Sequence, residues 1–101
     1  MKTVLKAKVQ EIAITDCQID YEGSLTLCPK IMDKLGVCEY EQVYINGKYK
    51  PHRIMTYLLK GKEGQCELNG GAVHFFKKGD IVHLLFFGIV DDEETIKPIV
   101  V

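Results

Sequence analysis

The chain has 101 residues, of which 47% are hydrophobic and 27% are charged, and its formal net charge is −1. This length predicts a single domain spanning residues 1–101, and the composition is typical of a globular protein and excludes a disordered one. Acidic and basic residues are nearly balanced and interspersed, so the charge does not indicate a nucleic acid or an anionic membrane as a partner.

The first part of the chain predicts strands that are interrupted by a Gly-Ser pair. Residues 3–14 are rich in Val, Ile and Leu with polar breaks, which favours a strand. A period of two across residues 17–28 predicts that four apolar residues share one face: Ile19, Tyr21, Leu25 and Leu27. Gly23-Ser24 lies inside this pattern. It is interpreted as a turn, as a bulge, or as a peptide bond that is meant to be cleaved.

The middle of the chain predicts one short helix and one hairpin. Pro29 suits the first position of a helix and Gly36 suits the position just after its end, so a helix of about two turns is expected between them. Residues 42–45 predict a strand, and the Asn46-Gly47 pair that follows is typical of a hairpin turn. Residues 53–59 predict the next strand.

The remaining elements alternate turns with short strands. In chain order we expect a turn at 60–64, a strand at 65–68, a tight connection at 69–71, one helical turn at 72–76, a turn at 77–80 and a strand at 81–90. The unbroken apolar run of that last strand predicts burial on both of its faces, and residues 91–101 are left open as a docked or a fraying tail. Strands at such close intervals predict an all-β fold built as a small, closed or nearly closed barrel.

Cysteines and histidines give no metal-site pattern. The four cysteines contain no Cys-x-x-Cys pair, and the three histidines are isolated; they are Cys17, Cys28, Cys38, Cys66, His52, His74 and His83. Lysines break up the apolar residues at the N-terminus, and no apolar run reaches the length of a membrane span. We therefore expect reduced, buried thiols in a cytoplasmic protein without a metal, in preference to a disulfide framework. His83 is expected to be a core or interface residue, and His52 and His74 to be exposed.

Two polar clusters are candidate binding residues. The loop of Asn69, Gly70, Gly71 and Ala72 is either a turn that needs a positive φ or a place where backbone N–H groups bind a carboxylate. On the 53–59 strand, Arg53 and Tyr57 share a face and Thr56 lies on the other. That face is either an anion-binding cleft or simply an outer face.

The order and spacing of these segments resemble the pyruvoyl-dependent aspartate 1-decarboxylases. The resemblance covers roughly residues 3–92 and rests on Tyr-Glu-Gly-Ser, then Arg-x-x-Thr-Tyr, then Asn-Gly-small-Ala. It implies a six-stranded double-psi β-barrel with short helices, assembled as a homotetramer with active sites at subunit interfaces. It also implies decarboxylation of L-aspartate to β-alanine and CO2, which supplies a precursor for pantothenate and coenzyme A.

The resemblance also assigns roles to residues. Self-cleavage between Gly23 and Ser24 would give chains 1–23 and 24–101, and Ser24 would become a covalent pyruvoyl group, with no metal and no pyridoxal phosphate. Tyr57 matches the proton donor, and Thr56 matches the residue that assists cleavage and lines the site. Arg53 and Lys8 match the basic residues that hold the substrate carboxylate, with Lys8 counted among the catalytic residues. The substrate-binding loop is matched by Asn69, Gly70, Gly71 and Ala72.

These residues suit the chemistry that the resemblance implies. Loss of the α-carboxylate leaves a carbanion, and a pyruvoyl group supplies the electron sink through its ketone and adjacent amide. Its formation needs the Ser24 hydroxyl close to the Gly23 carbonyl and a donor for the developing oxyanion, for which Thr56 is the candidate. Two alternatives stay open: a pyruvoyl enzyme for another small acidic amino acid, and an unprocessed barrel that acts as a binding or assembly module.

Overall fold

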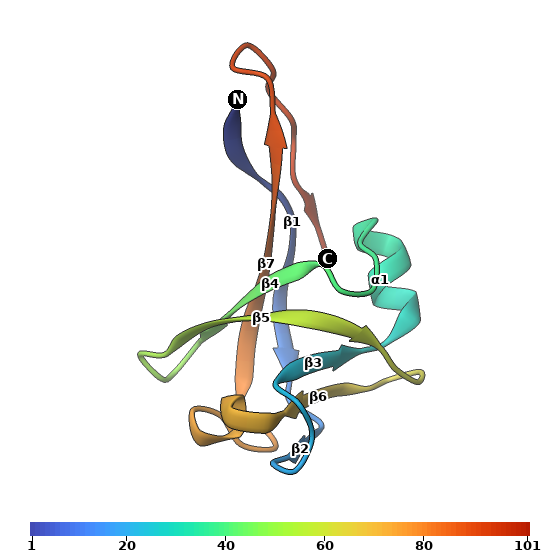
Figure 1. The fold of residues 1–101 in the computed structure, drawn as a ribbon, viewed down its shortest axis with the longest axis vertical. Coiled ribbons are helices and arrows are strands. Elements are labelled where there is room, and N and C mark those ends of the chain that lie inside the picture. Colours follow the sequence, from blue (N-terminus) through green and yellow to red (C-terminus); the bar gives the residue numbers. More distant parts are fainter.

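The protein is mainly β, and its strands form one curved sheet around a compact core (Figure 1). The structure is a computed structural model that describes residues 1–101. The strands are β1 (Lys2–Ala13), β2 (Asp16–Gln18), β3 (Ser24–Leu27), β4 (Gln42–Gly47), β5 (Arg53–Lys60), β6 (Cys66–Asn69), β7 (Ile81–Val90) and β8 (Ile99–Val100). They are joined by the helix α1 (Pro29–Leu35) and the 3-10 helix η1 (Gly70–His74). The all-β prediction is confirmed, and six of the eight strands are four residues or longer.

The strand order is β2-β6-β3-β5-β4-β7-β1-β8. The long antiparallel pair of β1 and β7 forms the upright part of the molecule, and β4 connects it to the remaining strands because β4 pairs with both β7 and β5 (Figure 1). β3 lies between β6, to which it is antiparallel, and β5, to which it is parallel. This central position of β3 places its first residue, Ser24, next to two other strands.

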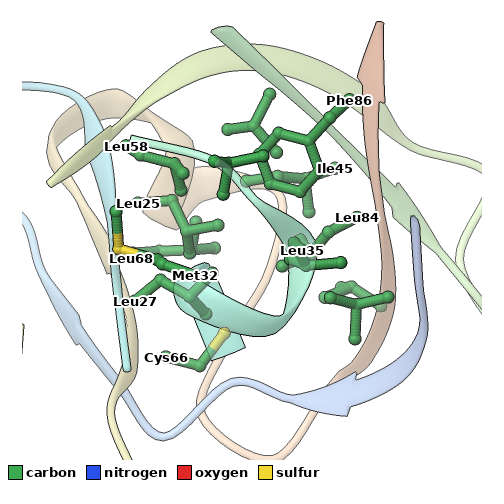
Figure 2. Close-up of a cluster of buried hydrophobic side chains, with 14 of the residues drawn as sticks. Leu25, Leu27, Met32, Leu35, Ile45, Leu58, Cys66, Leu68, Leu84 and Phe86 are labelled. Atoms are coloured by element: carbon green, nitrogen blue, oxygen red, sulfur yellow. The ribbon is translucent and has the colours of Figure 1, made fainter. Parts of the chain in front are cut away.

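The core contains seventeen buried apolar residues that come from both halves of the sheet and from α1. Figure 2 shows Leu25, Leu27, Leu58 and Leu68 on one side of α1, with Ile45, Leu84 and Phe86 on the other. The helix contributes Met32 and Leu35 to this cluster, since positions three apart share a helix face. Pro29 begins α1, and Gly36 ends it with a φ of 69°, as the sequence predicts.

Three expectations about the strands are wrong. The strand β4 runs through Asn46-Gly47, and the hairpin turn follows at residues 48–52, because Gly47 pairs with Val82 of β7 and the ladder continues. Ile19 and Tyr21 lie in a turn after β2 and are exposed, unlike Leu25 and Leu27, which are buried. Burial in β7 alternates: its core face is buried and its other face is half-buried or exposed, so the apolar run does not mark a strand that is covered on both sides.

Other expectations are resolved by local contacts. The tail docks, because Ile99 and Val100 form β8 in parallel with β1. All four cysteines are free; Cys28 and Cys66 are buried, whereas Cys38 is exposed, contrary to expectation. His52 is half-buried rather than exposed, and its ring packs edge-on against Phe75 and Phe76. Neither helix has the length and apolar character needed to cross a bilayer.

Candidate active site

The Gly23–Ser24 peptide bond lies where the turn after β2 enters β3. The parallel pairing of β3 with β5 aligns Leu25 with Leu58. Continuing this register backwards brings Gly23 to the level of Thr56 and Ser24 to the level of Tyr57. Strand pairing alone therefore brings together residues that are more than thirty positions apart in the chain.

Both partners of the Gly23–Ser24 bond are held by hydrogen bonds. The hydroxyl of Thr56 donates to the carbonyl oxygen of Gly23 at 3.3 Å. Ser24 is fully buried, and its hydroxyl donates at 3.3 Å to the carbonyl oxygen of Glu22, so the side chain is folded back along the upstream backbone. This contact holds Oγ on the side of the residues that precede the Gly23–Ser24 bond.

Asn69 holds the Ser24 hydroxyl from the opposite strand. Ser24 and Asn69 are direct partners in the antiparallel β3–β6 ladder, and the Asn69 amide donates to Ser24 Oγ and to Thr26 Oγ1, each at 2.9 Å. Asn69 is itself buried, and its Oδ1 atom has no hydrogen-bond partner. A buried acceptor without a donor is uncommon and calls for a ligand or a water molecule.

The loop after Asn69 packs directly against the cleavage point. Gly70 has a φ of 67°, and a Cβ at this position would lie 2.6 Å from the nitrogen and 2.7 Å from the Cα of Gly23. Glycine is required here for both its conformation and its lack of a side chain. Gly71 and Ala72 line the cavity beside Gly23.

Two cavities adjoin at this bond. One, of about 800 Å³, is lined by Gly23, Thr56 and the Gly71-Ala72 loop, and the other, of about 530 Å³, is lined by Ser24, Thr26 and Asn69. Tyr40 and Tyr57 line both cavities. Tyr57 is therefore a residue that both cavities share, at the level of Ser24 in the β3–β5 register.

The two predicted cations lie apart from this group within one chain. Arg53 donates from Nε to Asn46 Oδ1 at 2.8 Å, and its guanidinium lies over the Tyr44 ring at 5.5 Å, on the outer face of the sheet. Lys8 on β1 is separated from β5 by two intervening strands. Met55 on β5 pairs with Tyr44 on β4, Tyr44 pairs with Leu85 on β7, and Leu85 pairs with Lys8. Three strand spacings of roughly 4.8 Å separate the ends of this row by about 14 Å.

A family model for aspartate decarboxylase matches residues 1–101. The chain belongs to the aspartate decarboxylase family. The predicted resemblance is thereby confirmed.

Curated relatives of the aspartate decarboxylase family agree with this assignment. The aspartate 1-decarboxylase of Persephonella marina is 37% identical over 95 residues, which are 92% of this chain and 68% of the relative. That of a Dehalococcoides mccartyi strain is 37% identical over 95 residues, 92% of this chain and 77% of the relative. That of Bacillus cytotoxicus is 33% identical over 101 residues, 97% of this chain and 79% of the relative.

Sequence reasoning missed three residues that line these cavities. Glu22 and Glu67 line the smaller cavity with Ser24, and Tyr40 lines both cavities. The period of two could have found Glu67, since it lies two residues before Asn69 on the same strand. No sequence signal marks Tyr40. It lies in the loop before β4 with a φ of 71°, and the path of that loop is not encoded in a local pattern.

Proposed function

We propose that the protein cleaves itself between Gly23 and Ser24 and then decarboxylates L-aspartate to β-alanine and CO2, using a pyruvoyl group derived from Ser24. The observation that carries this proposal is the Thr56 hydroxyl donating to the carbonyl oxygen of Gly23. That oxygen is the atom on which charge develops when the neighbouring hydroxyl attacks. A donor already in place stabilises this charge without further reorganisation.

The maturation reaction follows from the contacts of the two residues. Ser24 Oγ attacks the carbonyl carbon of Gly23, the C–N bond breaks, and an ester replaces the amide. β-Elimination then removes the Cα proton of residue 24 and breaks the Oγ–Cβ bond, which leaves Gly23 with a carboxylate and residue 24 as dehydroalanine. Water then replaces nitrogen as ammonia, which leaves a ketone. The exposed Gly23 can change conformation during this sequence, whereas Ser24 is fixed by burial and by Asn69.

The residues around the bond fit the group that this reaction forms. Asn69 donates to Ser24 Oγ and Thr56 donates to the Gly23 carbonyl oxygen, the two oxygens that leave together as the Gly23 carboxylate. The smaller cavity gives space beside residue 24, where the ketone forms. Once formed, a pyruvoyl group supplies a ketone for the substrate amine and an amide carbonyl that accepts electrons. Tyr57 lines both cavities and is the candidate that returns a proton to carbon after CO2 leaves.

The larger cavity supports assembly with further copies of the chain. It is open to solvent at Met55, Phe75 and Tyr40, whose exposed fractions are 59%, 43% and 71%. Large apolar side chains grouped in this way favour a protein interface. We include in the proposal a homotetramer in which a neighbouring copy covers this surface and brings cations, including Lys8, to the substrate carboxylates. A monomer by light scattering at assay concentration would contradict this part of the proposal.

Intact-mass analysis of the purified protein tests the cleavage. The expected result is two species, residues 1–23 and residues 24–101, with the larger one lighter by one ammonia than a chain that begins with serine. The Ser24→Ala variant should stay at full length. A wild-type chain that remains intact after prolonged incubation would favour the unprocessed binding module.

Product analysis with the processed protein then tests the substrate. β-Alanine and CO2 are expected from L-aspartate, with L-glutamate as the comparison. Turnover of glutamate without turnover of aspartate would assign the pyruvoyl chemistry to another small acidic amino acid. We infer that β-alanine made in this way serves pantothenate and coenzyme A synthesis.

A further inference from the structure

The two cavities beside the Gly23–Ser24 bond differ in charge. The lining of the larger cavity contains no charged side chain. The smaller cavity is lined by Glu22 and Glu67 and by no Lys, Arg or His. Carboxylates of a substrate would therefore be repelled from the smaller cavity, and a cation would be attracted to it.

A second feature of the smaller cavity also requires a hydrogen-bond donor. Asn69 lines it, is 2% exposed, and has an Oδ1 atom without a partner. This acceptor is independent of the two carboxylates, because the amide nitrogen of the same side chain is already committed to Ser24 and Thr26. A ligand with several N–H groups would satisfy the carboxylates and this oxygen together.

Strand register places Glu67 close to the reactive position. In the β3–β6 ladder Ser24 faces Asn69 and Thr26 faces Glu67. Glu67 is thus the diagonal neighbour of Ser24 on one sheet face, at a Cβ separation of about 7–8 Å. Glu67 is half-buried, whereas Glu22 is exposed, so the charge of Glu67 is screened less by water.

The other groups near Glu67 are compatible with a bound cation. Tyr21, Tyr40 and Tyr57 line the cavity, and aromatic faces and phenol oxygens attract ammonium groups. On the other side of β6, Asp16 of β2 is level with Glu67, and its oxygens accept from the backbone N–H of Cys17 and from the side chain of Gln18. Asp16 therefore already has two donors. Of the two carboxylates that line the cavity, Glu67 is the less exposed and Glu22 the more exposed.

We propose that the smaller cavity binds the ammonium group of the substrate and that the Glu67 carboxylate accepts one of its protons. This inference rests on the proposed function and assigns Glu67 a catalytic role that the sequence did not indicate. The transfer converts the ammonium to a neutral amine and Glu67 to its acid form, which frees the nitrogen lone pair for reaction at the carbon that Ser24 supplies. The substrate carboxylates then lie toward the larger cavity, where no acidic side chain repels them.

Binding of a simple amine to the unprocessed chain tests the inference without turnover. The full-length Ser24→Ala variant is titrated with n-propylammonium and followed by NMR. Saturable shifts of the Asn69 side-chain amide and the Glu67 carboxyl carbon are expected, and propionate should cause none. Adding Glu67→Gln should weaken the binding about tenfold, as expected for the loss of a charge-assisted hydrogen bond. The matched control, Glu93→Gln in the exposed loop after β7, should leave binding unchanged.

The inference would be overturned if no saturable shifts appear, or if the chain with both Ser24→Ala and Glu67→Gln binds n-propylammonium as tightly as the chain with Ser24→Ala alone. Kinetics of the processed enzyme provide the second test. Glu67→Gln should still give both fragments by mass, and its kcat/KM for L-aspartate should fall about tenfold, with partial recovery in Glu67→Asp. If fragments and β-alanine form at wild-type rates in Glu67→Gln, the inference fails and the proposed function stands. If the wild-type chain stays whole, the proposed function fails, and the amine titration still decides whether the cavity binds a cation.

Discussion

Replacing Thr56 with valine should slow self-cleavage strongly while leaving the fold intact. The substitution removes the hydroxyl that donates to the Gly23 carbonyl oxygen and keeps the branched shape at a strand position. Loss of one such hydrogen bond in the ground state changes the free energy of unfolding by about 1 kcal/mol. The expected effect is therefore on the reaction rather than on folding.

The geometry sets the size of the effect. The Thr56–Gly23 contact of 3.3 Å is longer than the usual O–H···O distance of about 2.8 Å, so it contributes little before reaction and more as charge develops on the oxygen. Removing one oxyanion donor typically costs about 10²–10³ in rate. Thr56 is half-buried, so water partly replaces the lost donor, and we expect the lower value of about 100-fold, or about 2.7 kcal/mol.

The assay follows the decay of full-length protein by intact mass after rapid purification in the cold. Thr56→Ser keeps a hydroxyl and should cleave within about tenfold of the wild-type rate, which is one decade or about 1.4 kcal/mol. Thr3→Val makes the same chemical change at an exposed site at the start of β1 and should cleave at the wild-type rate. A Thr56→Val chain that cleaves as fast as wild type would refute the assigned role of this contact.

Three further predictions follow from backbone and charge. Gly70→Ala should stop or greatly slow cleavage and lower the melting temperature, because its Cβ would meet the Gly23 backbone at 2.6–2.7 Å. Tyr40→Asn should raise the free energy of unfolding in urea by about 1 kcal/mol, since the 71% exposed ring buries little and asparagine tolerates the φ of 71° better. The Lys50 ammonium, at 2.6 Å, lowers the pKa of Asp80 below its ordinary value of 3.8. Stability from this pair is present above that value and is lost as the pH falls through the lowered pKa, so Lys50→Met should destabilise the protein more at pH 6 than at pH 2.

Each of these has a decisive comparison. Gly64 also has a positive φ, of 78°, but a Cβ there would have no neighbour within 4 Å, so Gly64→Ala isolates conformational strain and should leave cleavage unaffected. Cleavage of the Gly70→Ala chain at the wild-type rate would show that close packing against Gly23 is unimportant. A Tyr40→Asn chain that is less stable would mean that the ring contributes packing. If Lys50→Met lowers stability equally at both pH values, ionisation of Asp80 does not account for the effect.

The sequence was sufficient wherever local chemistry decides the structure. Pro29 and Gly36 set the limits of α1 through their restricted and permissive backbones, and the apolar alternation of Leu25 and Leu27 predicted the buried face of β3. The order of short motifs was enough to identify the family. These features depend on neighbours in the chain, so a linear pattern contains them.

The failures have a common cause in strand pairing. The Asn46-Gly47 pair favours a turn, but pairing of Gly47 with β7 extends the strand through it. The apolar run of β7 suggested full burial, but only one of its faces meets the core. Propensity describes one segment, whereas ladder hydrogen bonds are made between segments, and the latter prevailed here.

The sequence by itself determined the all-β class, the helix limits and the residues Gly23, Ser24, Thr56 and Tyr57 as the candidates for chemistry. Only the tertiary structure decided that Thr56 donates to the Gly23 carbonyl, that Gly70 closes on the same residue, and that Glu67 shares a cavity with Ser24. The physical reason is that β3 lies between β5 and β6 in the sheet. The register of those two pairings sets which distant side chains meet, and it is fixed by burial of the whole core rather than by any short stretch of sequence.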